Sequence, residues 1–150
     1  MIVTEAGPAS QAEWDAFVRS APGGSFLQSW SWGEFQRAAG FPIARLLVTS
    51  GNSSTQHPTP DTLRAVCLVI RRPLPLRHFY FSVPWGPVFR EDLSAADMAA
   101  AFSALTGAFR TRLRSGGVFA RVEPKLSKES GIAHALESAG FTRAERSIQP

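Results

Sequence analysis

Apolar and polar residues alternate along the chain in two patterns, which together predict a mixture of strands and helices. Runs rich in β-branched and other apolar residues predict strands over residues 2–4, 43–49, 63–71, 79–83, 117–123 and 142–148. Apolar residues at helical spacing predict helices over residues 10–21, 29–39, 94–116 and 129–138. The resulting order, β-α-α-β-β-β-α-β-α-β, predicts an α/β fold in which helices cover the faces of a mixed sheet.

Residues with strong preferences for helix ends support these boundaries. Ser10, with Glu13 three positions later, predicts a capping box at the start of the first helix, and Ser94 is placed to cap the third helix. Gly40 and Gly140 stand where the second and fourth helices should end.

Two segments predict connections between strands. Residues 50–62 are rich in small polar residues and predict a solvated loop. Residues 71–77 contain two prolines and predict a loop that joins two antiparallel strands. Arg71, Arg72, Arg77 and His78 form the densest basic cluster of the chain. This cluster is compatible with a phosphate or RNA contact, and a merely solvated loop is the slightly favoured interpretation.

The composition is that of a globular chain with one core. The chain has 150 residues, of which 44% are apolar and 19% are charged. A chain of this length buries roughly two thirds of the surface that it exposes when unfolded. No apolar run approaches the ~18 residues of a membrane span, and no signal peptide is recognisable, so we expect a cytoplasmic protein that can still meet the membrane surface from the cytoplasmic side.

The residue types that most often carry catalysis do not form a familiar pattern. The single cysteine, Cys67, excludes an internal disulfide, and its place in an apolar run predicts a buried structural thiol. The three histidines, His57, His78 and His134, lack the spacing of metal ligands. Nucleophile-elbow, Walker and dinucleotide motifs are absent from the sequence.

Two aromatic segments next to glycines are the most informative feature. Residues 28–35 and 80–88 hold three of the four tryptophans. Trp30 and Trp32 lie two positions apart, so on a helix they point about 160° apart. One of them should therefore enter the core, while the other reaches a surface, and Trp32 is the candidate for lining a cleft. Trp85 follows a predicted strand, at the kind of edge where open α/β sheets bind ligands. In the competing interpretation these rings simply fill the core.

An ordered set of short motifs extends over nearly the whole chain. Its members are Gln28 with Trp32-Gly33, Tyr80-Phe81 leading to Gly86-Pro87-Val88, Arg121-Val122-Glu123-Pro124, Gly140-Phe141 and Ile148-Gln149-Pro150. This ordered set resembles the Fem family, the aminoacyl-tRNA-dependent transferases that build the interpeptide bridges of peptidoglycan.

The resemblance implies a GNAT-like fold, which is a mixed and mostly antiparallel sheet flanked by helices. It further implies a protein about twice as long, built from two such domains, of which residues 1–150 would be the N-terminal one. The end of the chain directly after a predicted strand agrees with a longer protein. The C-terminal domain of the same protein would then be a partner of this chain.

The resemblance also implies an activity and its substrates. In the family, a muramyl pentapeptide carried on UDP or on a lipid diphosphate binds in a cleft. An aminoacyl group arrives on tRNA, as co-substrate, and is passed to the amine of the third residue of the stem peptide. No further cofactor and no catalytic protein nucleophile are implied.

Three residues are candidates for substrate binding through the resemblance. Trp32 matches the aromatic residue of the family's precursor-binding helix, and Trp85 takes a position that lines the cleft. The family's helix also supplies a lysine near the diphosphate, and here Arg37 is the candidate to replace it.

Two other classes of function stay open. The chain is alternatively part of an N-acyltransferase of the same superfamily, which would use a thioester donor and an amine from polysaccharide or lipid metabolism. Residues 89–93, before the third helix, argue against coenzyme A binding in this part, because they contain no glycine and two acids that would repel a diphosphate. The third class is a non-catalytic module that binds nucleic acid or a glycan.

Overall fold

The computed structural model describes residues 1–51, 62–125 and 132–144. Several sequence predictions therefore fall outside the described residues. They concern most of the loop at 50–62 with His57, the start of the fourth helix at 129–131, the motif at 148–150 and much of the last predicted strand.

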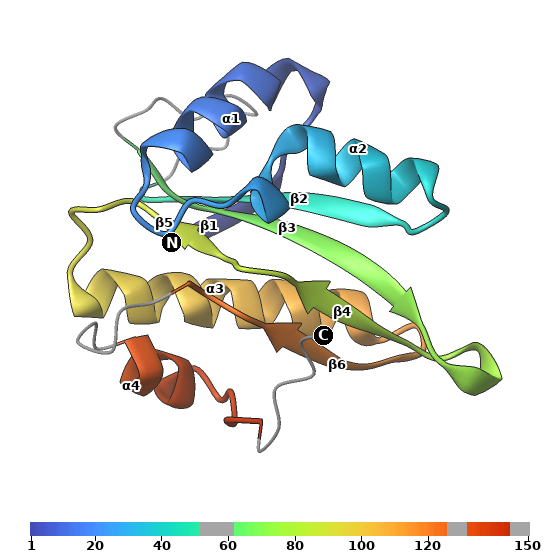
Figure 1. Ribbon diagram of the computed structural model, residues 1–150. Coiled ribbons are helices and arrows are strands. Elements are labelled where there is room, and N and C mark those ends of the chain that lie inside the picture. Colours follow the sequence, from blue (N-terminus) through green and yellow to red (C-terminus); the bar gives the residue numbers. More distant parts are fainter. Residues whose placement is uncertain (52–61, 126–131, 145–150) are drawn as a thin grey trace.

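A six-stranded sheet lies between two layers of helices (Figure 1). The strands are β1 (Ile2–Glu5), β2 (Ile43–Thr49), β3 (Leu63–Pro73), β4 (Phe79–Val83), β5 (Val88–Phe89) and β6 (Gly117–Val122). The helices are α1 (Gln11–Ser20), α2 (Trp30–Ala38), α3 (Ala95–Leu113) and α4 (Ile132–Ser138). The strand order is β1-β2-β3-β4-β6, with β5 paired to β3. Every pair is antiparallel except β4–β6, which is parallel because α3 crosses over between these two strands.

The core consists of two apolar layers that share β3. Leu68 and Ile70 face α1 and α2, whereas Cys67 and Val69 face the layer that contains α3. Because both faces of β3 are covered, its sequence is apolar almost throughout. Cys67 is fully buried, as predicted, and burial raises the pKa of its thiol well above the ordinary value. No helix of the described residues is long and apolar enough to cross a membrane.

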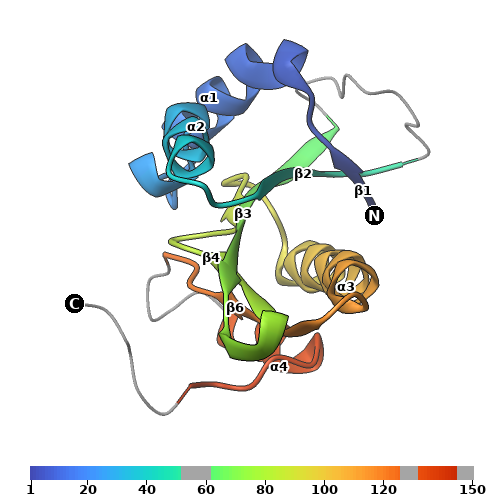
Figure 2. The same ribbon diagram turned by 90° about the vertical axis from the view of Figure 1, so that its right-hand side faces the viewer.

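The helices α1 and α2 cover only part of their face of the sheet. Seen along the sheet in Figure 2, these helices lie over β2 and β3, and the same face of β4 and β6 is left open within the described part of the chain. Tyr80 and Phe119 stack on this open face with their ring centroids 4.9 Å apart. Phe119 remains 46% exposed, although the neighbouring Phe79 and Phe81 are buried against the α3 side.

Most predicted boundaries agree with the structure to within one or two residues, and the strand that ends at Pro73 is longer than predicted. Arg71 and Arg72 continue the ladder by pairing with Phe81 and Tyr80, so the connection shrinks to a tight turn. The structure adds the two-residue strand β5, which is too short to produce a pattern in the sequence. Residues 142–144 form no strand, which contradicts the start of the last predicted strand.

The predicted capping box at Ser10 is wrong, whereas two serine caps form at other helices. Ser10 has φ −88° and ψ 3°, so it continues a preceding 3-10 turn and its side chain makes no capping hydrogen bond. A capping serine needs an extended backbone. Ser29 and Ser94 have that conformation, and their hydroxyls accept hydrogen bonds from Trp32 N and Asp97 N. The helices α2 and α3 therefore start where the sequence predicted.

Candidate functional site

The two aromatic segments are joined by one buried side chain, that of Gln28. Its amide Nε2 donates to the carbonyl oxygen of Pro84 over 2.7 Å, and its Oε1 accepts from the backbone N–H of Leu68 over 2.8 Å. The side chain is fully buried. Gln28 thus connects the segment before α2 to the centre of β3 and to the turn after β4.

Gly86 allows this connection because it has no side chain. A Cβ at position 86 would lie 2.5 Å from Cδ of Gln28, much closer than any real carbon contact. The backbone at Gly86 therefore approaches another part of the chain closely, and the group that comes close is the amide of Gln28.

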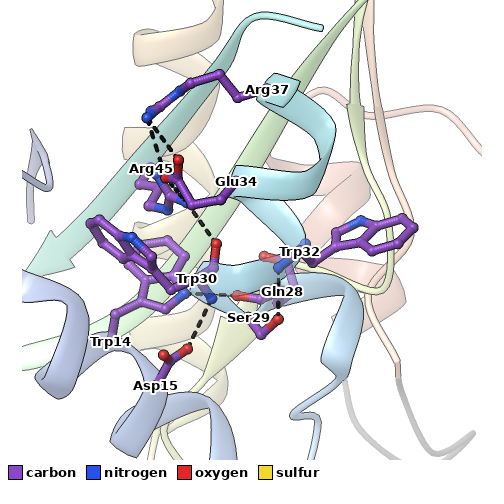
Figure 3. A network of polar contacts seen from close by, with 9 residues as sticks. All are labelled: Trp14, Asp15, Gln28, Ser29, Trp30, Trp32, Glu34, Arg37 and Arg45. Carbon is purple, nitrogen blue, oxygen red and sulfur yellow. Dashed lines mark hydrogen bonds and ion pairs between the residues drawn. The ribbon is translucent and has the colours of Figure 1, made fainter. Parts of the chain in front are cut away.

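Trp30 and Trp32 point to opposite sides of α2, as predicted from their spacing (Figure 3). Trp30 is 5% exposed and packs edge-on against Trp14, with 6.1 Å between the ring centroids. Its backbone N–H donates to Asp15 of α1 over 2.9 Å, which holds the two helices together.

Trp32 is partly buried against the core layer under α1 and α2 and lies between two exposed aromatic rings. Its ring stacks on that of Phe35, with 5.1 Å between the ring centroids, and packs at a tilt against Phe26, with 5.4 Å between the centroids. Phe26 and Phe35 are among the most exposed large apolar side chains of the described residues, at 65% and 59%. The indole Nε1 of Trp32 has no acceptor among the described residues, so one hydrogen bond remains unmade beside these rings. We call Phe26, Trp32 and Phe35 the aromatic shelf.

Trp85 lies in the turn after β4 and is 38% exposed. Its φ of 48° is in the left-handed region, which is unfavourable for a bulky side chain. Lys125, which follows β6, places its Nζ 5.3 Å from the centre of the indole. An aromatic ring and a cation therefore meet at the carboxyl ends of the parallel strands β4 and β6. Backbone strain of this kind is concentrated at functional sites.

Arg37 lies on another face of α2 than Trp32. It pairs with Glu34 over 3.1 Å, and Figure 3 shows the ring of Trp32 pointing away from this ion pair. Arg37 lines an open groove of about 450 Å³ between α2 and the start of α1. Gln28 therefore links the segment before α2 to the turn that holds Trp85, whereas Arg37 pairs with Glu34 on another face of α2.

The floor of this groove contains a buried arginine that the sequence analysis did not single out. Arg45 is 3% exposed, and its guanidinium lies 3.7 Å above the ring of Trp30. Its Nη2 donates to Glu34 over 2.9 Å and to the carbonyl oxygen of Trp30 over 2.8 Å. Burial lowers the pKa of Arg45, and the hydrogen bond with Glu34 opposes that effect. The signal in the sequence was a single charge within the otherwise apolar pattern of residues 43–49.

Gly33 lets α2 approach Arg45, so we expect Gly33→Ala to destabilise the fold by about 1–2 kcal/mol. A Cβ at position 33 would lie 3.0 Å from Cζ of Arg45 and nearer still to its Nη2. The matched control is Gly107→Ala in α3, where nothing lies within 4 Å of the added carbon. There the better helix propensity of alanine should stabilise the protein by about 1 kcal/mol. Urea denaturation measures the change in the free energy of unfolding for both variants. If Gly33→Ala stabilised the protein as Gly107→Ala does, the close packing of α2 on Arg45 would be contradicted.

The start of α3 is occupied by acidic side chains of the chain itself. Asp92 pairs with Arg90, and this hydrogen bond lowers the pKa of the Asp92 carboxyl. The side chain of Asp97 accepts a hydrogen bond from Ser94 over 2.7 Å. Negative charge at this helix N-terminus opposes the binding of a diphosphate there. The described residues also contain no group of three side chains able to hold a metal ion.

Comparison with known proteins shows similarity in three-dimensional structure. No known family profile matches the chain, and no curated protein matches it in sequence. Among solved structures, FemX matches with a TM-score of 0.70 and 20% identity over 95% of this chain. The chain spans 32% of the length of FemX.

Two proteins provisionally assigned as acetyltransferases match over nearly their whole length. One has a TM-score of 0.62 and 14% identity, with all of this chain and 97% of the other covered. The second, from Agrobacterium tumefaciens strain C58, has a TM-score of 0.63 and 13% identity, with all of this chain and 99% of the other covered. Identities this low establish the fold, and the similarity to FemX supports the Fem resemblance at that level. The chain has the acyltransferase-type fold, with a mixed and mostly antiparallel sheet flanked by helices.

Proposed function

We propose that this chain is the acceptor-binding domain of a Fem-type aminoacyltransferase. The enzyme would transfer an amino acid from aminoacyl-tRNA to the stem peptide of a peptidoglycan precursor in the cytoplasm. One observation carries the proposal: Gln28 ties the segment that leads into the aromatic shelf to the turn that presents Trp85. Exposed aromatic rings held in fixed positions are suited to bind the sugar and peptide parts of such a precursor.

The reaction is the aminolysis of an ester. The amine of the stem peptide attacks the ester carbonyl of the aminoacyl-tRNA, an amide bond forms, and the carbon–oxygen bond to the tRNA ribose breaks. The amine loses a proton, and the ribose hydroxyl takes one up. No protein nucleophile is required, and Cys67 is not suited to be one because it is buried and its pKa is raised. The contribution of this domain would be to position the acceptor amine.

Within this proposal, Lys125 is a better contact for the diphosphate of the precursor than Arg37. Its ammonium group lies beside Trp85, whereas Arg37 is paired with Glu34 on another face of α2. We expect Lys125→Ala to weaken binding of a UDP-linked muramyl pentapeptide about tenfold, since hydrogen bonds to charged groups contribute about 1.5–3 kcal/mol. Arg37→Ala should change the dissociation constant less than about twofold. Isothermal titration measures the dissociation constants of both variants. A larger increase for Arg37→Ala than for Lys125→Ala would show that Arg37 contacts the diphosphate.

Removal of either tryptophan should weaken precursor binding. We expect Trp32→Ala and Trp85→Ala each to raise the dissociation constant at least about tenfold, because a buried aromatic contact contributes more than about 1 kcal/mol. Val118→Ala is the control, because it removes an exposed apolar side chain from β6. In the enzyme that contains this chain, the same substitutions should lower transfer from charged tRNA. No transfer with any aminoacyl-tRNA would refute the proposed function.

A second candidate, an N-acyltransferase that uses a thioester donor, is favoured by one finding. The two provisionally assigned acetyltransferases have nearly the length of this chain and match it from end to end. The carboxylates of Asp92 and Asp97 at the start of α3 would repel the diphosphate of coenzyme A at that position. Titration with acetyl coenzyme A separates the candidates, because tight binding would favour this second one.

A further inference from the structure

The hairpin of β3 and β4 extends beyond the rest of the molecule (Figure 1). Its turn runs from Pro75 to His78 and is closed by a hydrogen bond of 3.2 Å from His78 N to the carbonyl oxygen of Pro75. The side chain at its tip, Leu76, is 88% exposed, the largest value among the exposed apolar residues of the described chain. Its exposure is unusual because a leucine normally gains stability by leaving water.

The backbone of this turn is strained at both central positions. Leu76 has φ 59° and ψ 33°, and Arg77 has φ 64°. Positive φ at both positions is the geometry of a type I′ turn, which strongly prefers asparagine followed by glycine. Leucine and arginine therefore do not serve the stability of this hairpin. Residues that keep such strain at a surface point to a function for their side chains.

The surroundings of the tip are basic. Residues 62–90 contain five arginines and no acidic residue. Arg71 and Arg72 lie on opposite faces of the hairpin, over the rings of Phe79 and Phe41. Among the described residues, no carboxylate pairs with Arg71, Arg72 or Arg77. Their charges are thus available to a negatively charged partner.

The turn between α3 and β6 belongs to the same end of the molecule. Gly116 accepts a hydrogen bond from Phe79 N over 3.2 Å, so this turn lies against the base of the hairpin. It adds the exposed Arg114 and, one residue into β6, Val118, which is 58% exposed. This end of the molecule therefore combines protruding aliphatic side chains with arginines that form no ion pair within the described part of the chain.

We propose that this end of the molecule docks onto an anionic lipid surface. Leu76 would enter the boundary between headgroups and acyl chains, while Arg71, Arg72 and Arg77 contact lipid phosphates. Each basic residue near an anionic membrane strengthens binding about fivefold, which corresponds to about 1 kcal/mol. Arginine can keep its aliphatic part in the apolar region and its guanidinium at the phosphates. A single inserted leucine and a few charges predict weak and reversible binding.

The chemistry of the tip favours lipid over RNA. Proteins that bind single-stranded RNA stack bases on aromatic rings. The turn instead presents Leu76 and one proline, Pro75, the rings of Phe41 and Phe79 lie beneath arginines, and Tyr80 and Phe119 stack on each other. Aliphatic side chains surrounded by basic residues are the pattern of peripheral membrane proteins.

The decisive variant replaces the turn by the sequence that its backbone prefers, Leu76→Asn with Arg77→Gly. This double variant should melt at a higher temperature than the original chain, because both replacements relieve positive-φ strain. It should nevertheless bind vesicles of phosphatidylcholine with phosphatidylglycerol at least about tenfold more weakly. A loss of binding in a more stable protein would separate docking from folding.

Further arms of the vesicle experiment test the charges. The original chain should bind vesicles that contain phosphatidylglycerol and bind pure phosphatidylcholine much more weakly. Binding should fall when the ionic strength rises from about 0.1 M to about 1 M, which shortens the Debye length from about 10 Å to about 3 Å. Arg71→Ala should weaken binding about fivefold, while the matched change Arg19→Ala in α1 should have no effect.

Three outcomes would overturn the proposal. The first is equal binding to neutral and anionic vesicles, and the second is vesicle binding that the tip variants leave unchanged. The third is an absence of vesicle binding together with binding of RNA, or self-association, that the Asn-Gly turn abolishes. None of these outcomes depends on transferase activity, so they are distinct from a failure of the proposed function.

Discussion

Gln28→Ala should lower the free energy of unfolding by about 4 kcal/mol. The substitution leaves the N–H of Leu68 and the carbonyl oxygen of Pro84 without their buried partner, at a cost of about 1–3 kcal/mol for each group. It also opens a cavity in a fully buried position, which adds to the loss. Denaturation with urea, followed by circular dichroism, measures the change.

The control for this variant is Gln11→Ala, which removes the same side chain from an exposed position at the start of α1. It should change the stability by less than about 0.5 kcal/mol. If the protein with Gln28→Ala is studied at a temperature where it is folded, precursor binding should also weaken, because the turn with Trp85 has lost its anchor. A loss of stability below about 1 kcal/mol would mean that Gln28 does not tie the two aromatic segments together.

Gly86→Ala should destabilise the protein by about 3 kcal/mol, because the added methyl group overlaps with the amide of Gln28. The control is Gly7→Ala. Gly7 has φ −91° and ψ 174°, and nothing lies within 4 Å of a Cβ at this position, so its replacement should change the stability by less than about 0.5 kcal/mol.

A double-mutant cycle links Gly86 to Gln28. In a protein that already carries Gln28→Ala, the alanine at position 86 enters space that the glutamine has vacated. The two substitutions together should therefore lower the free energy of unfolding by about 2 kcal/mol less than the sum of their separate effects. Strict additivity would show that the turn after β4 and the segment before α2 are energetically independent, which would remove the observation that carries the proposed function.

The candidate substrate site and the proposed membrane contact lie at opposite ends of β4. The turn with Leu76 precedes this strand, and Trp85 follows it. The five residues of β4 have a length of about 17 Å at 3.3 Å per residue. A precursor bound near Trp85 would thus lie above the lipid surface, within reach of a soluble charged tRNA. The two proposals remain separable, because each is tested by its own ligand.

Local residue patterns were sufficient for much of the fold. The apolar run of β3 predicts a strand covered on both faces, and the spacing of Trp30 and Trp32 predicts that they point to opposite sides of the helix, where Trp30 is buried and Trp32 is partly buried. The caps at Ser29 and Ser94 lie within three residues of the groups that they bind, so neighbours in the sequence determine them. The same kind of argument was wrong at Ser10, because a preceding 3-10 turn controls the backbone there.

The relation between the candidate site residues needed the tertiary structure. Gln28 is 56 positions away from its partner Pro84, and no periodic pattern marks it as buried. The strain at Leu76 and Trp85 is likewise a property of backbone angles and not of residue types. By itself the sequence determined the elements of this protein and the faces that they present, because those depend on residues within about four positions of each other. Only the tertiary structure brings the side chain of Gln28 against Gly86 and places Arg37 on another face of α2 than Trp32. Contacts between distant segments such as these form only when the whole core packs.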